Sequence, residues 1–153
     1  MELSTKEFQK IVEDIMYINR KFSDSSHLKS LSGDILSYTG TKLAAMKSLL
    51  IEVKADAELA AKNADTDYKA VKAKALRRLV GQPIKEGGAK ISATAAGELL
   101  YDEEDVKAAS VHKNEQEAYW NKLRSITSDS HDLIDSIKSR VIDLQGARRD
   151  ERH

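Results

Sequence analysis

Residues 69–90 contain seven cationic side chains and a single acidic one, Glu86, so this segment carries a net charge of +6. Clustered lysines and arginines contact phosphate groups, and a patch that is repeated in an assembly binds a polyanion multivalently. The alternative interpretation is that the cations solvate a helix end, where they are favourable. The candidate phosphate-binding residues are Lys69, Lys72, Lys74, Arg77, Arg78, Lys85 and Lys90.

An acidic segment follows the basic one. Glu98, Asp102, Glu103, Glu104 and Asp105 give residues 98–105 a net charge of −5. Carboxylates are favourable at a helix N-terminus, so the run predicts that a helix starts here. It is also a candidate contact for a partner protein.

Residues that carry out catalysis or bind metals are sparse. His27, His112, His131 and His153 are scattered, and no two of them have the i,i+4 spacing of a metal site. The chain has no cysteine, which excludes disulfides, thiolate ligands and cysteine nucleophiles. It also has no glycine-rich phosphate loop of the nucleotide-binding kinds. We therefore expect no catalytic residue, no metal and no cofactor, and a protein that is not an enzyme.

The composition predicts the elements that position these residues. Nearly half of the 153 residues are Ala, Glu, Lys, Leu or Arg, a mixture typical of long helices and coiled coils. Leu, Ile, Val and Phe together make less than a quarter of the chain, which is a small core for a monomer. No apolar run is long enough for a transmembrane helix, and the start of the chain lacks the pattern of a signal segment. We expect an intracellular, cytoplasmic protein.

A short helix is predicted first. Ser4 and Glu7 have the spacing of a capping box, and apolar residues follow at helical spacing up to Ile18. The helix should end near Lys21–Phe22, because a polar break follows over Ser23–Ser26 and a weaker one over Ser30–Gly33. Residues 1–32 are expected to form this N-terminal part.

A long helical hairpin is predicted over residues 33–145. In its first helix, residues 33–80, apolar positions recur in alternating steps of three and four, the spacing of a coiled coil. That helix would be about 70 Å long. The positions are Leu43, Met46, Leu50, Val53, Ala57, Ala60 and Ala64, followed by Tyr68, Val71, Ala75 and Leu79. Tyr68 lies next to the basic segment and is a candidate for stacking on a base, although filling this stripe is the favoured interpretation.

A basic loop rich in glycine, with the chain's only proline, is predicted over residues 81–91. A short helix over Ser92–Leu100 and a long one from the acidic run to Gly146 should complete the hairpin, leaving a basic tail over residues 146–153. The predicted fold class is all-α, a long antiparallel helical hairpin with short flanking helices and coiled-coil-like packing, assembling into a ring-like homo-oligomer. The last helix has more apolar positions than one partner needs, which predicts a homo-oligomer with an interface at Leu133, Ile134, Ile137, Val141 and Leu144.

Three stretches are similar to the phage T4-type recombination mediator family of UvsY. They are Val71-Lys72-Ala73-Lys74-Ala75-Leu76, Leu100-Tyr101-Asp102-Glu103-Glu104-Asp105-Val106 and Asp135-Ser136-Ile137-Lys138-Ser139-Arg140. The first resembles the segment of the family's DNA-binding helix, and the other two resemble parts of its last long helix. Their order and the intervening loop also agree, over roughly residues 65–145. The N-terminal third shares only helical character.

The resemblance implies a function. Members of this family form ring-like oligomers that bind single-stranded DNA on a basic surface. They displace single-strand-binding protein and help to load a RecA-like recombinase. The family's basic pair corresponds to Lys72 and Lys74, and its C-terminal helical region drives ring assembly. If the protein is encoded by a phage, it would act in the cytoplasm of an infected bacterium.

Two other functions remain open. A structural or chaperone-like phage coiled coil explains the helical stripes and the zero net charge equally well, but it gives no reason for the basic segment. A small regulator could bind a protein partner through its acidic run. A peripheral membrane helix is disfavoured, because the basic segment lacks the apolar face that such helices use.

Overall fold

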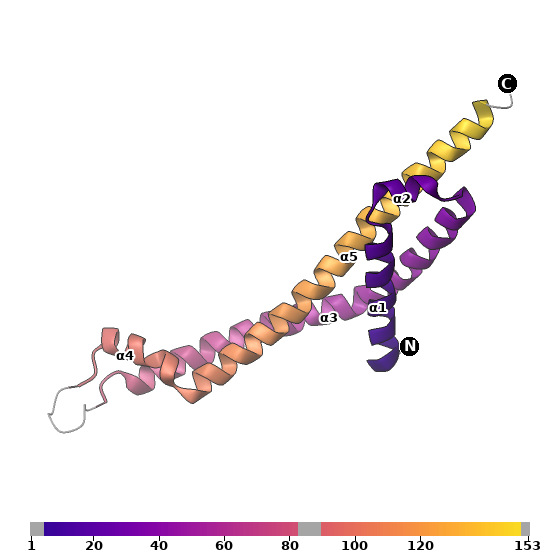
Figure 1. Ribbon diagram of the computed structural model, residues 1–153. Helices are drawn as coiled ribbons and strands as arrows, with labels where there is room; N and C mark the ends of the chain where they lie inside the picture. Colours follow the sequence, from indigo (N-terminus) through magenta and orange to yellow (C-terminus); the bar gives the residue numbers. More distant parts are fainter. Residues whose placement is uncertain (1–4, 83–89, 151–153) are drawn as a thin grey trace. The chain divides into compact units, whose positions relative to one another are not determined.

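The structure, a computed structural model, describes residues 5–82 and 90–150. Over these residues it contains five α-helices and a 3-10 turn and no β-strand, which confirms the predicted all-α class (Figure 1). The elements are α1 (Thr5–Phe22), α2 (Ser25–Ser30), α3 (Gly33–Leu79), α4 (Ala93–Leu99), the 3-10 turn η1 (Leu100–Asp102) and α5 (Glu104–Asp150).

The chain divides into two compact units. Unit 1 comprises residues 1–54 and 122–153, and unit 2 comprises residues 55–121. The long helices α3 and α5 each contribute to both units, so this division differs from the predicted one, in which residues 33–145 formed one part. The two long helices pack together, as the hairpin prediction expected.

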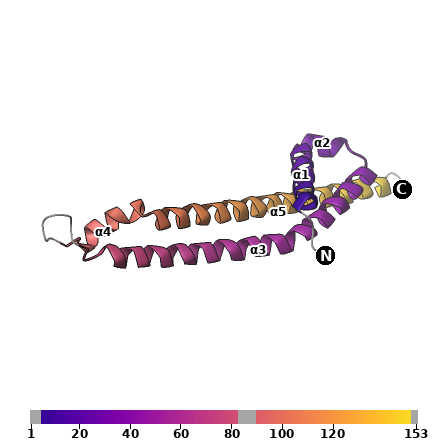
Figure 2. The same cartoon turned by 90° about the horizontal axis from the view of Figure 1, so that it is seen from below.

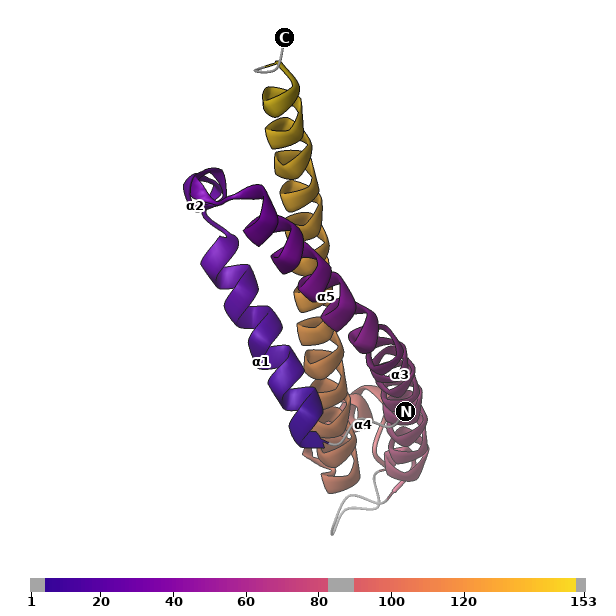
Figure 3. The same ribbon diagram turned by 90° about the vertical axis from the view of Figure 1, so that its right-hand side faces the viewer.

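Unit 1 has the larger apolar core. Helix α1 contributes a stripe to it that includes Ile15, which is fully buried, while Tyr17 on the opposite side is exposed. Figure 3 shows α1 beside the first part of α3 and the last part of α5. The buried core residues are Val12, Ile15, Ile18, Phe22, Leu28, Leu36, Leu43, Met46, Leu50, Ile126, Leu133, Ile134 and Ile137.

One glycine marks a close approach within this core. A Cβ atom placed on Gly40 of α3 would lie 3.1 Å from Cγ2 of Ile137 on α5. That is closer than an ordinary van der Waals contact, and Ile137 is itself buried. Gly40 therefore lets α3 and α5 pack closely at this point.

Unit 2 is built on small residues. Ala57, Ala61 and Ala64 of α3 are buried, and side chains this small allow a neighbouring helix to approach closely. In this unit α3 and α5 run antiparallel, and α4 lies beside their ends (Figure 2). Its apolar cluster consists of Ala75, Leu79, Ala96, Leu100 and Val106, with Tyr68, Val71, Leu76 and Ile91 packed against it.

Backbone hydrogen bonds join the ends of the segment between α3 and α4. The amide of Gly81 donates to the carbonyl of Ile91 at 3.1 Å, and the amide of Ile91 donates to the carbonyl of Gln82 at 2.9 Å. Gly81 has a φ of +83°, a conformation that glycine adopts without strain. Residues 83–89, which include most of the predicted basic loop, lie outside the described residues, as does the Ser4 capping position.

Two predicted boundaries are wrong. The polar break after α1 contains the start of α2, because the Asp24 carboxylate caps this helix by accepting from the Ser26 amide at 2.8 Å, and Leu28 anchors it in the core. At the other end, α5 continues through Gly146 to Asp150. An isolated glycine costs a helix only about 1 kcal/mol, and without a following proline that cost does not end the helix.

Candidate nucleic-acid interface

The predicted phosphate-binding residues on α3 all lie in unit 2, but they do not share one face. Lys72 and Lys74 are two positions apart and so about 200° apart around the helix. Lys69 and Lys72 lie on one flank, Lys74 and Arg78 lie on the other, and Arg77 lies between them on the outer side. Lys90 precedes α4 and is exposed, and Lys85 lies outside the described residues.

The first flank brings lysines and tyrosines together. We call Tyr68, Lys72, Tyr101 and Lys113 the tyrosine–lysine cluster. Nζ of Lys72 donates a hydrogen bond to the Tyr101 hydroxyl at 3.0 Å, and it lies 5.0 Å from the Tyr101 ring centroid and 6.0 Å from that of Tyr68. The hydrogen bond from Lys72 to Tyr101 raises the pKa of the lysine, which stays charged. Nζ of Lys113 lies 5.4 Å from the Tyr68 ring centroid.

Asp65 is the anion beside this cluster. Its carboxylate pairs with Lys69 at 2.6 Å and with Lys113 at 3.1 Å. The two lysines lower the pKa of Asp65, Lys69 most strongly, and Asp65 in turn raises the pKa of Lys113. Glu117 also raises the pKa of Lys113, so three lysines face two carboxylates and leave this flank with a net positive charge.

The second flank is largely neutralised by the protein itself. The Arg78 guanidinium donates to Glu103, and it lies 3.3 Å from both carboxylate oxygens of Asp105. These contacts, Glu103 first, raise the pKa of Arg78. The predicted acidic start of α5 therefore sits against the predicted basic end of α3. Lys74 and Arg77 are exposed and have no hydrogen bond or ion pair with another described residue.

Sequence reasoning missed Tyr101 and Lys113. Tyr101 is 57% exposed on the 3-10 turn, and Lys113 is on α5, so neither belongs to the basic segment. Only the packing of η1 and α5 against α3 brings them to Tyr68 and Lys72. Tyr68 itself is half-buried: it packs against the apolar cluster of unit 2, as the stripe predicted, and it also contacts both lysines.

The predicted oligomerisation residues are covered within a single chain. Leu133, Ile134 and Ile137 are buried in the core of unit 1, and Val141 and Leu144 are partly buried against it. The partners that the sequence assigned to other subunits are here α1, α2 and α3. An interface between chains needs a different, exposed surface.

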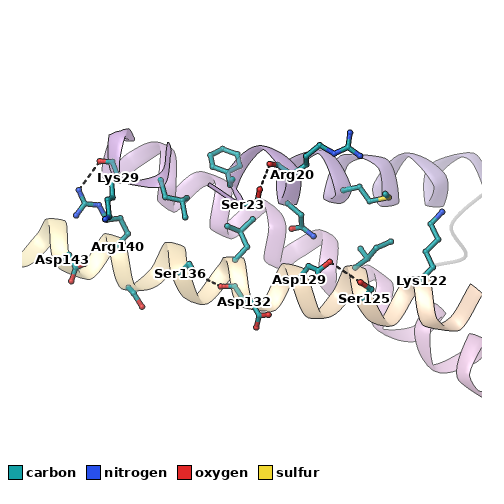
Figure 4. Close-up of a pocket in the computed structure, with 17 residues that line it drawn as sticks. Arg20, Ser23, Lys29, Lys122, Ser125, Asp129, Asp132, Ser136, Arg140 and Asp143 are labelled. Carbon is teal, nitrogen blue, oxygen red and sulfur yellow. Dashed lines mark hydrogen bonds between the residues drawn. The ribbon is translucent and has the colours of Figure 1, made fainter. Parts of the chain in front are cut away.

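Unit 1 also has a cleft of about 900 Å³ between α1, α2 and α5 (Figure 4). It carries charges of both signs, and the protein satisfies several of its polar groups internally. The Arg140 guanidinium, for example, donates to the Lys29 carbonyl at 3.3 Å. Its charged lining residues are Arg20, Lys29, Lys122, Asp129, Asp132, Arg140 and Asp143. This mixture does not favour an anionic ligand.

The described part of the chain holds no group of three or more His, Cys, Asp or Glu side chains placed to bind a metal ion. None of its helices over the same residues is long and apolar enough to cross a lipid bilayer. Comparison with known protein families, with curated proteins and with solved structures finds no match to this chain.

Proposed function

We propose that the protein is a non-catalytic single-stranded-DNA-binding protein whose site is the tyrosine–lysine cluster with Lys69. The observation that carries the proposal is the placement of Lys72 between two tyrosine rings, one of them exposed. Lysines neutralise phosphates, and an exposed ring stacks on an unpaired base whatever its identity. Bases in a duplex are already stacked on one another, so this combination favours the single strand.

The finer proposal is a recombination mediator. A homo-oligomer of this chain would bind single-stranded DNA through many copies of the cluster, displace single-strand-binding protein and promote loading of a RecA-like recombinase. Competition for the same phosphates supplies the displacement, because each protein must neutralise them to bind. The three stretches that resemble the mediator family support this step.

A structural or chaperone-like coiled coil is the second candidate, and the ion pairs favour it. Arg78 contacts Glu103 and Asp105, and Lys69 and Lys113 contact Asp65. On this view the basic segment exists to hold α3 against the start of α5. The two candidates differ in whether the remaining positive charge binds a polyanion.

The test is fluorescence anisotropy of a labelled single-stranded oligonucleotide at several salt concentrations, with a duplex as competitor. Lys72→Ala/Lys113→Ala should weaken binding about tenfold or more at low salt and lower the salt dependence by about two phosphate contacts. Asp65→Asn should tighten binding, because it removes the anion between Lys69 and Lys113. Lys10→Ala/Lys138→Ala is the matched control, since it removes two exposed lysines from unit 1.

No binding by the unaltered protein at low salt would refute DNA binding and favour the structural coiled coil. Binding that responds equally to both lysine pairs would place the site elsewhere. For the finer proposal, the measurement is recombinase filament formation on DNA coated with single-strand-binding protein, which the protein should accelerate.

A further inference from the structure

Helix α3 carries a second stripe, which faces solvent. We call it the exposed stripe, and it lies entirely within unit 1. Ile35, Tyr38 and Leu49 are 50%, 71% and 44% exposed, and they lie along one face of the helix. The six positions follow one another in alternating steps of three and four, the spacing of a coiled-coil seam, and all are exposed. They are Ile35, Tyr38, Lys42, Ala45, Leu49 and Glu52.

The exposed stripe is distinct from the buried seam of the same helix. Each of its first five positions precedes a buried residue by one: Leu36, Thr39, Leu43, Met46 and Leu50. One residue is a turn of about 100°, so the two stripes point in different directions. The buried seam is filled by the core of unit 1, and within the described residues nothing buries the exposed one.

The charges of the exposed stripe identify its partner. If two copies of α3 pack antiparallel with Ala45 opposite Leu49 of the second copy, the equal three-residue steps outward bring Lys42 opposite the second copy's Glu52. Two-fold symmetry then forms this pair twice. In a parallel, in-register pair, Lys42 would instead face Lys42 of the second copy and Glu52 would face Glu52, so like charges would repel each other. Neither Lys42 nor Glu52 has an ion-pair partner among the described residues.

We propose that the exposed stripe is the self-association surface of this protein, and that it pairs antiparallel with the same stripe of a second copy. Ala45 is small and leaves room for Leu49 of the facing helix, and the two-fold axis repeats this contact. In this register Ile35 and Tyr38 lie opposite positions 59 and 56 of the second copy, beyond its exposed stripe, so the apolar contact consists of Ala45 and Leu49 of both copies. The inference takes from the proposed function only the statement that the protein self-associates. It assigns the interface to the exposed stripe instead of the predicted oligomerisation residues on α5, which are covered within a single chain.

The first experiment is sedimentation velocity over a range of protein concentrations, without DNA. The unaltered protein should form dimers or larger species, and Leu49→Lys should weaken association about tenfold or more. Ile51→Lys is the matched control: Ile51 is 56% exposed on the same helix and lies about 200° from Leu49. Because both positions are exposed, circular dichroism should show unchanged helix content for both variants.

A charge swap tests the orientation. Lys42→Glu and Glu52→Lys should each weaken self-association, because each opposes like charges twice. An equimolar mixture of the two variants, and the double variant Lys42→Glu/Glu52→Lys, should both restore it. In a parallel pair, mixing the two single variants would also bring opposite charges together and strengthen association. The double variant, however, would associate no more strongly than the unaltered protein, and neither single variant would associate more weakly than it.

Disulfide trapping gives an independent reading, since the chain has no cysteine of its own. A mixture of Ala45→Cys and Leu49→Cys should cross-link faster than either variant alone, whereas fastest linkage of Ala45→Cys to itself would overturn the antiparallel pairing. A protein that stays monomeric at all concentrations would overturn self-association altogether. Association that Leu49→Lys leaves unchanged would overturn this surface alone, and neither result depends on DNA binding.

Discussion

In the proposed DNA-binding site, Tyr101 combines a contact with a charged lysine and an exposed ring. Its hydroxyl accepts from Lys72, while more than half of the side chain remains exposed. The ring and the hydroxyl can be removed separately. A ring that stacks on bases contributes to binding only when a base is present, whereas a lysine acts on the phosphate alone.

We predict that Tyr101→Leu weakens binding of an oligothymidylate about tenfold, because stacking is worth about 1–3 kcal/mol per base. Tyr101→Phe should bind like the unaltered protein, because it keeps the ring and loses only the hydrogen bond from Lys72. The measurement is anisotropy with two probes of equal length, oligothymidylate and an abasic strand. The abasic strand should not distinguish the variants. Equal losses on both probes would mean that Tyr101 only positions Lys72.

At the same scale, the sequence singled out Lys69, Lys72 and Tyr68 but missed Tyr101 and Lys113. Lys69 and Lys72 stand out because charge is visible in a linear sequence. Tyr101 and Lys113 become part of the site only because η1 and α5 pack against α3, which no local pattern fixes. Arg78 shows the reverse case: its charge predicts a phosphate contact, and in the structure it contacts Glu103 and Asp105, a pairing that the linear sequence does not reveal.

The long helices were the most predictable elements, because a periodic apolar stripe over many turns is a strong signal. The sequence placed the end of α1 near Phe22 and the start of α3 at Gly33, as found. It failed where a single residue decides. The Asp24 cap starts α2 inside a polar break, and Gly146 does not end α5. The stripe of α5 was predicted to pack against other subunits, whereas in the structure it packs against α1, α2 and α3 of the same chain.

Gly40 gives a prediction at the scale of the elements. Gly40→Leu should destabilise the protein by about 1–3 kcal/mol, because the added side chain is forced against Ile137 in a packed core. Gly146→Leu should be neutral or stabilising by up to about 1 kcal/mol, since leucine is a better helix former and nothing lies within 4 Å of the added Cβ. Urea unfolding monitored by circular dichroism measures both. Equal stability of the two variants would show that α3 and α5 do not approach closely at Gly40.

At the scale of the whole molecule, the two proposed surfaces lie in different units. The tyrosine–lysine cluster is in unit 2, and the exposed stripe is in unit 1. Each can therefore be altered without touching the residues of the other. Their coupling is thermodynamic: a dimer that holds two clusters on one DNA strand binds the second cluster at a high effective concentration.

We predict that Leu49→Lys weakens binding to a long single strand about tenfold or more, while leaving unchanged the affinity for an oligonucleotide that spans one cluster. Ile51→Lys adds the same positive charge to the same helix, so it corrects for the electrostatic gain that the new lysine brings. Anisotropy with the two strand lengths, at protein concentrations where the unaltered chain is associated, makes the measurement. If Leu49→Lys binds the long strand as tightly as Ile51→Lys does, the clusters act independently, and self-association has a role other than DNA affinity.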